Sequence, residues 1–222
     1  MEKTDEENLA QYISATRIRL RKTSPFFAAL SLYAEIDFNQ DVPIAATNGK
    51  KIIFNPNTYF KLPPKERDGV YLHELLHMAL LHNFRKGVRD HRIFNIAADI
   101  VINGMIENEG KVKIPSFGIR NKDLEHLSVE EIYEILIKKS QKFKDEFSDL
   151  IYDNSSINKE GADNLKDSNC KSEKEIRAYW KQAINDSKLI AKSAGQKVYP
   201  GSFDRNLRSE EHTSELQSPM YL

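Results

Sequence analysis

The sequence has little cysteine, with only Cys170 among its 222 residues. No disulfide can therefore form within the chain, and this fits a reducing compartment such as the cytoplasm, where we expect the protein. The first residues, MEKTDEENLAQY, are acidic and polar and lack the apolar core of a secretory signal. The apolar stretch near residues 70–81 is interrupted by His and Glu and is too short to span a membrane. We therefore expect no membrane association.

The sequence also lacks an excess of charge of either sign. It has 33 Lys and Arg residues and 33 Asp and Glu residues, so its formal net charge is zero. This balance argues against a nucleic-acid surface built on bulk positive charge. The one compact basic run, RKGVRDHR at residues 85–92, gives only thin support to a nuclease. We expect no nucleic-acid partner.

The periodicity of the chain predicts an α+β protein with a small mixed or antiparallel sheet. Residues 31–38 (SLYAEIDF) alternate well enough for a strand, and Asn48-Gly49 predicts a hairpin turn because both residues tolerate positive φ. A second strand, residues 51–54, would end before Asn55-Pro56. Amphipathic patterns and capping signals predict helices over residues 5–22, 64–83, 93–107, from 128 onward and 173–193. The apolar positions of the first helix are Leu9, Ile13, Ile18 and Leu20. A capping box formed by Ser128 and Glu131 begins the fourth.

Composition divides the chain into four parts. Residues 1–141 carry the periodic segments and form the expected domain, while residues 142–172 are polar and are expected to be a flexible linker. An amphipathic helix within residues 173–207 would begin a truncated C-terminal region. Residues 208–222 contain RSEEHTSELQS, which resembles a translated sequencing adapter, so we expect this end to be an artefact.

The sequence HELLH at residues 73–77 is an HExxH motif and carries the chemistry. Two histidines four residues apart project from nearly the same face of a helix, separated by about 40° and one turn. Their imidazoles can bind one Zn²⁺, so we predict His73 and His77 as ligands. Glu74 is rotated by about 100° from His73, which suits a general base that takes a proton from the attacking water. Two imidazoles and a carboxyl group in a buried helix need either a metal or polar partners, so the alternative is that both are core histidines paired with carboxylates.

A catalytic zinc needs a third protein ligand, and several residues are candidates. In FNIAADIVIN, residues 94–103, the polar positions 95, 99 and 103 form one stripe on an apolar helix, and Asp99 is its acidic centre. We predict Asp99 as the ligand and the asparagines as its supporting shell. His82 would face away on a continuous helix and would fit only if the helix ended early. Three weaker candidates lie nearer helix ends: Asp90, His91 and Glu107.

Together, these motifs resemble the metallopeptidase domain found at the N-terminus of bacterial von Willebrand factor A-like proteins. The resemblance rests on PFFAAL at residue 25, PIAATNG at 43, FNP at 54, HELLHMALLH at 73, FNIAADIVIN at 94 and LSVEEIY at 127. It implies a zincin-like fold with the sheet packed on the HExxH helix, a von Willebrand A-like domain downstream and a MoxR-type AAA ATPase as partner. The chain departs from the family pattern at Phe94, where tryptophan is expected, and by ending before that second domain.

These observations predict a zinc metallopeptidase that acts on a peptide or protein substrate. Residues 51–54 are expected to be the edge strand that pairs with extended substrate. The alternative outside enzymology is a zinc-stabilised adaptor domain for an assembly of an AAA ATPase with a von Willebrand A-like protein. Glu74 argues against the adaptor, because a structural zinc site has no use for a base.

Overall fold

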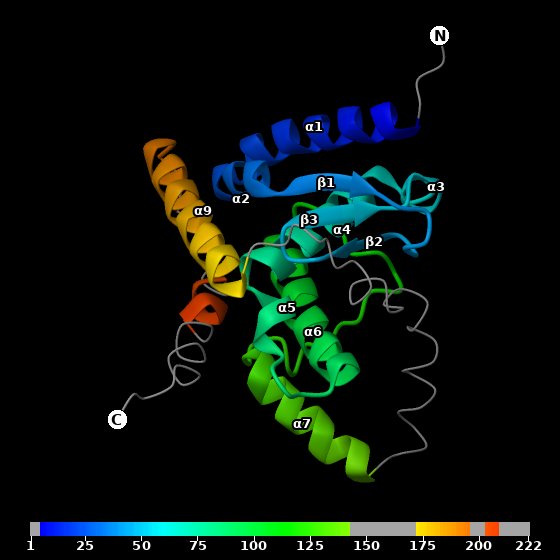
Figure 1. The fold of residues 1–222 in the computed structure, drawn as a ribbon, viewed down its shortest axis with the longest axis vertical. Helices are drawn as coiled ribbons and strands as arrows, with labels where there is room; N and C mark the ends of the chain where they lie inside the picture. Colours follow the sequence, from blue (N-terminus) through cyan, green and yellow to red (C-terminus); the bar gives the residue numbers. More distant parts are fainter. Residues whose placement is uncertain (1–4, 143–171, 196–202, 209–222) are drawn as a thin grey trace.

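The computed structural model describes residues 5–142, 172–195 and 203–208, and these residues form a mostly helical α+β structure with a small sheet (Figure 1). The expected linker, residues 142–172, lies outside the described residues except at its two ends, and so do residues 209–222 of the expected artefact. The division of the chain into these segments stays a prediction. No helix in the described ranges is long and apolar enough to cross a membrane.

The N-terminal part of the chain is helical for longer than its pattern predicts. Helix α1, Asp5–Thr23, is followed by α2, Pro25–Leu30, and by the 3-10 helix η1, Ser31–Tyr33. Only the second half of the strand expected at residues 31–38 forms, as β1, Glu35–Phe38. Leu9, Ile13 and Leu20 of α1 are buried as expected, but Ile18 is 63% exposed. Thr16 faces inward instead, because its hydroxyl group donates a hydrogen bond to the buried carboxylate of Asp68.

The sheet has three strands in the order β1-β3-β2 and mixes the two pairing types. Strand β2, Ala45–Thr47, pairs antiparallel with β3, Lys51–Phe54, across the predicted hairpin, and Gly49 has a φ of 92° in its turn. Strand β1 pairs parallel with β3. The prediction that residues 51–54 form an edge strand is therefore wrong, because β3 has a partner on both sides. The edge beside the HExxH helix is β2, which contacts that helix.

The HExxH helix, α4, runs from Pro64 to Ala79 and ends earlier than predicted. The short helix α3, Pro56–Tyr59, precedes it. Helix α4 begins at Pro64, where a proline is favourable because the backbone N–H groups of a first turn have no partner within the helix. Leu81 then takes a left-handed conformation with φ 56° and ψ 32°, and a separate short helix, α5, follows at His82–Arg85. The expected continuous helix through residue 83 is therefore wrong, and the direction of the chain changes just before His82.

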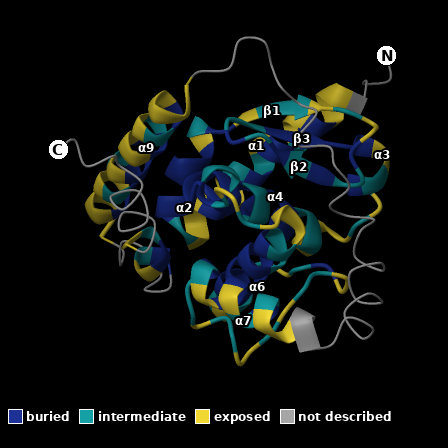
Figure 2. Ribbon diagram, turned by 60° about the horizontal axis from the view of Figure 1, so that its bottom comes forward, coloured by how far each residue is buried: buried dark blue, intermediate teal, exposed yellow. Residues whose placement is uncertain are grey.

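Three further long helices and a short helical segment at residues 203–208 complete the described part of the chain. Helix α6, His91–Glu109, packs along α4 and against α7, Val129–Lys142, while α9, Glu173–Ser193, packs on α2 and α4. The N-terminal capping boxes of α7 and α9 are formed, with Ser128 paired to Glu131 in the first. Figure 2 shows α6 mostly buried at the centre and α9 with an exposed outer face. The HExxH helix therefore lies at the centre of the molecule, between the sheet and α6.

Candidate metal centre

The two histidines of the HExxH motif meet a carboxylate from α6. His77 Nε2 lies 3.0 Å from His73 Nε2 and 3.0 Å from Asp99 Oδ1, and His73 Nε2 lies 3.4 Å from the same oxygen. The structure therefore brings together the three residues that the sequence predicts as ligands. Among the described residues, the ligand atoms of His73, His77 and Asp99 lie close enough together to hold one metal ion.

These separations can be compared with those that a metal requires. A tetrahedral Zn²⁺ with bonds of about 2.0–2.1 Å keeps its ligand atoms about 3.3–3.4 Å apart. The three observed separations, 3.0, 3.0 and 3.4 Å, are equal to this value or slightly shorter. The donor set also fits, because two imidazole nitrogens and one carboxylate oxygen suit a divalent transition metal. The residues present therefore fit a bound metal ion.

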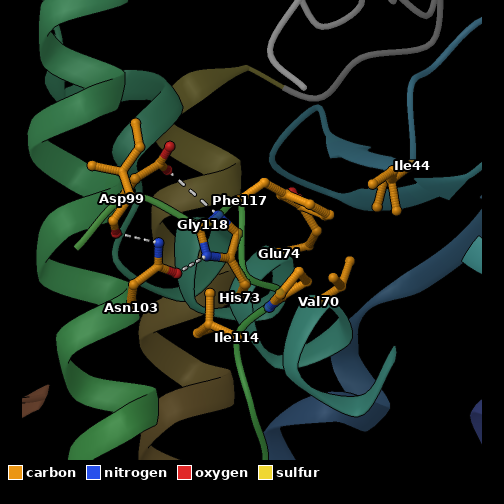
Figure 3. A pocket seen from close by; sticks show the side chains of 12 residues that line it. Ile44, Val70, His73, Glu74, Asp99, Asn103, Ile114, Phe117 and Gly118 are labelled. Atoms are coloured by element: carbon orange, nitrogen blue, oxygen red, sulfur yellow. Dashed lines mark hydrogen bonds and ion pairs between the residues drawn. The ribbon is translucent and has the colours of Figure 1, made fainter. Parts of the chain in front are cut away.

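Asn103 orients the first histidine. Asn103 lies one turn after Asp99 on α6, and its Oδ1 is 2.8 Å from His73 Nδ1. Its amide nitrogen donates to the backbone oxygen of Ile119 at 2.7 Å, which leaves the oxygen to face the histidine. His73 Nδ1 therefore carries the proton and donates to Asn103, and Nε2 is left to point at the other two residues. Figure 3 shows this arrangement. The supporting role predicted for the asparagines fits the contact made by Asn103.

Burial and charge shift the ionisation of the acidic and basic groups at this point. Burial opposes the charged form of His73, but the hydrogen bond to Asp99 and its charge outweigh it and raise the His73 pKa to about 9. Burial also opposes ionisation of Asp99, yet hydrogen bonds from His73 and His77 hold its pKa well below the usual range. Without a metal, Asp99 is therefore an anion that faces a protonated His73, and a bound metal ion would take the place of that proton.

Glu74 lies in the wall of a pocket that contains His73, Asp99 and Asn103 (Figure 3). Burial raises the pKa of the Glu74 carboxyl, and the nearby histidines offset part of this shift. None of the described residues that line the pocket is Lys or Arg, so its charged side chains are acids and histidine. The remaining lining is largely apolar: Ile44, Ala45, Val70, Ile114, Pro115, Phe117, Gly118 and Ile119. The pocket therefore places a carboxyl group, two ligand candidates and apolar surface around one space.

The apolar wall comes from the loop after α6, which the sequence analysis missed. A Cβ on Gly69 of α4 would lie 1.9 Å from the backbone oxygen of Lys113, so only glycine lets this loop cross the helix so closely. The loop is also held by the backbone bond from Lys113 to Lys65 and by Ile114 N, which donates to Glu107 Oε1. A glycine in the middle of a buried helix was the signal in the sequence that could have revealed this crossing.

His82 lies closer to the site than a continuous helix allows. The left-handed Leu81 turns the chain so that His82 Nδ1 is 3.3 Å from His77 Nδ1. The expectation that His82 faces away is therefore wrong, and the early helix end is the reason. His82 still does not join the three converging atoms, because it contacts the nitrogen of His77 opposite to the one that faces Asp99. Burial also lowers the pKa of His82 well below its usual value, so its ring is neutral.

Asp90, His91 and Glu107 lie away from the converging group. The side chain of Asp90 caps the start of α6 by accepting from Ile93 N, and His91 is exposed in the next position. Glu107 Oε1 accepts a hydrogen bond from Ile114 N, and Glu107 Oε2 lies 3.5 Å from Arg120 Nη1. None of the three belongs to the set of residues whose ligand atoms converge. The arrangement favours Asp99 over these residues as the third ligand.

Comparisons with known proteins complete this description. Neither the curated proteins nor the solved structures contain a match to the chain. The family model described as "Putative metallopeptidase domain" matches residues 9–215, which include the whole of the site. Because this match covers most of the chain, the protein belongs to the Putative metallopeptidase domain family.

Proposed function

We propose that the protein is a zinc-dependent peptidase of zincin-like fold that hydrolyses a peptide bond in the pocket beside His73. The observation that carries this proposal is the convergence of His73, His77 and Asp99 within 3.0–3.4 Å of one another, with Glu74 in the wall of the same pocket. Three protein ligands are typical of catalytic zinc, which keeps a further position open, whereas structural sites are usually closed by four.

The residues divide the chemistry between them. A zinc ion held by His73, His77 and Asp99 would supply Lewis-acid chemistry at the scissile carbonyl and at the attacking water. Glu74 takes the proton of the attacking water and passes it to the leaving amine, and the pKa raised by its burial makes the carboxylate a better base near neutral pH. Asn103 keeps the His73 ring in one tautomer throughout. The loop from Ile114 to Ile119 gives the pocket an apolar wall.

The substrate would bind along the edge of the sheet. Ile44 O accepts from Asn55 N, and Ala46 is opposite Ile53, so hydrogen bonding to β3 alternates along β2. The N–H and C=O of the intervening Ala45 therefore point away from β3. Ala45 also lines the pocket, where an extended peptide can pair with it and place an apolar side chain among Ile114, Pro115 and Phe117.

Two other functions, an adaptor and a nuclease, would make different demands on the residues of this chain. A zinc-stabilised adaptor for a MoxR-type AAA ATPase and a von Willebrand A-like domain would keep the metal and have no need of Glu74. These partners stay predictions. The nuclease is disfavoured, because Arg85 of the basic run is 1% exposed and is paired with Glu130. Arg89 of the same run lies over the ring of Tyr133, with its guanidinium carbon 5.8 Å from the ring centroid.

The decisive experiment is elemental analysis of the purified protein followed by digestion of a broad peptide library, read by mass spectrometry. Zinc is expected at one equivalent; two imidazoles and a carboxylate also suit Fe(II), so the analysis decides between them. Glu74→Gln should keep the metal and lower hydrolysis by about 10²–10⁴-fold, because the residue transfers a proton. Glu66→Gln, the same change two turns earlier on α4, is the matched control and should retain activity.

Two results would contradict the peptidase. Equal hydrolysis by wild type and Glu74→Gln would exclude Glu74 as the base. A zinc-loaded wild type that cleaves no peptide in the library would favour the adaptor instead.

A further inference from the structure

We propose that His82 is a positioning residue for the metal site, whose Nδ1 accepts a hydrogen bond from His77 Nδ1–H and fixes the His77 ring. This inference rests on the metal site of the proposed function and concerns a residue outside the three converging ligands. It assigns to His82 the role for His77 that Asn103 has for His73. Its basis is the position of His82, its surroundings and the backbone that places it there.

The two nitrogens of His77 face different partners. Nε2 lies 3.0 Å from Asp99 Oδ1, and Nδ1 lies 3.3 Å from His82 Nδ1. An imidazole that ligates a metal through Nε2 is neutral and carries its proton on Nδ1, which then needs an acceptor. His82 Nδ1 is in position to accept, and its own proton is then on Nε2. Each ligand histidine thereby has an acceptor behind it: the amide oxygen of Asn103 for His73, and His82 for His77.

His82 lies in largely apolar surroundings, so its contact with His77 is the reason we infer for a polar side chain at this position. His82 is 3% exposed, and its ring packs edge-on against Phe94, with centroids 6.5 Å apart. Its Nε2 is buried and has no hydrogen-bond partner among the described residues. A buried imidazole without partners is unfavourable, and a leucine of similar size would fill the same space without this penalty. The bond to His77 is the interaction that a leucine could not make.

The backbone before His82 is strained in a way that produces this contact. On a continuous helix, His82 would lie about 140° around the axis from His77. Leu81 has a φ of 56° and is the only non-glycine residue with positive φ in the described part of the chain. Such a conformation is unfavourable for a residue with a side chain, because the Cβ atom comes too close to the following carbonyl oxygen. Arg85 offsets part of this cost by donating to Leu80 O and pairing with Glu130 on α7. Strain held in this way beside a site is typical of a functional geometry.

The test compares His82→Leu with His82→Asn by competition for zinc against a chromogenic chelator. Leucine fills a similar space but has no hydrogen-bond acceptor. The side-chain oxygen of asparagine lies near the position of the histidine Nδ1 and can accept the hydrogen bond from His77. We expect His82→Leu to bind zinc about 10–100-fold more weakly than wild type and His82→Asn to recover most of the difference. Thermal unfolding of the metal-free variants is measured in parallel and should not follow the order of their zinc affinities.

A role in packing alone predicts another pattern. Equal zinc affinity of His82→Leu and wild type, or equal losses in both variants, would overturn the proposal. A wild type that binds zinc and cleaves no peptide would contradict the peptidase and leave this inference intact. A wild type that binds no zinc would contradict both.

A second measurement needs no variant and so remains informative if His82→Leu does not fold. In the zinc-loaded wild type, nitrogen-15 NMR of the imidazole rings should show His77 protonated at Nδ1 and His82 protonated at Nε2 only. A proton on His82 Nδ1 would mean that His82 cannot accept from His77, and this result would overturn the proposal.

Discussion

Helix α4 buries polar groups at both of its ends, and the two clusters differ in how their charges are satisfied. Near the start of the helix, Asp68 faces α1. About one and a half to two and a half turns later, His73 and His77 face Asp99 on α6. Each cluster joins α4 to another helix through a buried carboxylate, so burial and charge alone do not distinguish a structural cluster from a functional one.

The cluster around Asp68 is complete within the protein. Arg19 binds both oxygens of Asp68, at 2.8 and 2.6 Å, and neutralises its charge. The hydroxyl groups of Thr16 and Tyr12 donate to Oδ1 at 2.8 and 3.1 Å. This carboxylate has an opposite charge and several donors, so it needs no ion. The cluster connects α1 to α4 and serves the fold.

The cluster around Asp99 is arranged differently. Three ligand atoms converge on one point, and no Arg or Lys reaches it among the described residues that line the pocket. Asn103 and His82 meanwhile occupy the far nitrogens of the two imidazoles. The candidate metal site is therefore distinguished by ligand atoms that converge without a basic side chain between them, while the far nitrogens of both histidines are already paired.

The largest difference between the clusters should appear in metal affinity. Asp99→Ala removes a ligand and should weaken zinc binding by more than about 100-fold, beyond the effect expected of a supporting residue. Asp68→Ala should leave zinc affinity within about threefold of wild type, because it removes no ligand. Chelator competition measures both values. Comparable losses in the two variants would remove the distinction drawn between the clusters.

The next effect concerns folding and should depend on pH in only one of the two clusters. Asp68→Ala removes the carboxylate that pairs with Arg19 and one of the two acceptors of both Thr16 and Tyr12, so it should lower the free energy of unfolding by about 2–3 kcal/mol. Urea denaturation in the presence of a chelator measures this, so that metal binding does not contribute. Asp99→Ala should cost a similar amount at pH 7, because in the metal-free protein it removes the anion that faces a protonated His73. The loss should become smaller above pH 9, where His73 is neutral in the wild type. A loss in Asp99→Ala that stays the same as the pH rises would show that Asp99 serves the fold without His73.

The smallest effect tests the geometry of the Asp68 cluster. Arg19→Lys keeps the positive charge but loses the two-pronged contact with Asp68, and the side chain of Arg19 is 46% exposed. We therefore expect a loss of only about 1 kcal/mol in the same urea experiment, with zinc binding unchanged. A loss equal to that of Asp68→Ala would show that the guanidinium contacts dominate the cluster.

Local patterns were enough to predict much of the fold and the three residues whose ligand atoms converge. The spacing of His73 and His77 places both on one face of any helix, and the polar stripe through Asp99 and Asn103 indicates a buried polar contact. The turn at Asn48-Gly49 and the capping box at Ser128 follow from the conformations that single residues tolerate or stabilise. These features depend on neighbours within about four residues, which is why they can be read without tertiary contacts.

The tertiary structure decided what depends on residues far apart in the chain. The parallel pairing of β1 with β3 made β3 central and left β2 as the edge, and no pattern within either strand records this order. The end of α4 at Leu81 is stabilised by Arg85 and its pairing with Glu130, a residue 45 positions away. That break, in turn, brings His82 behind His77. A leucine in a left-handed conformation contradicts its own local preference, so only long-range contacts can select it.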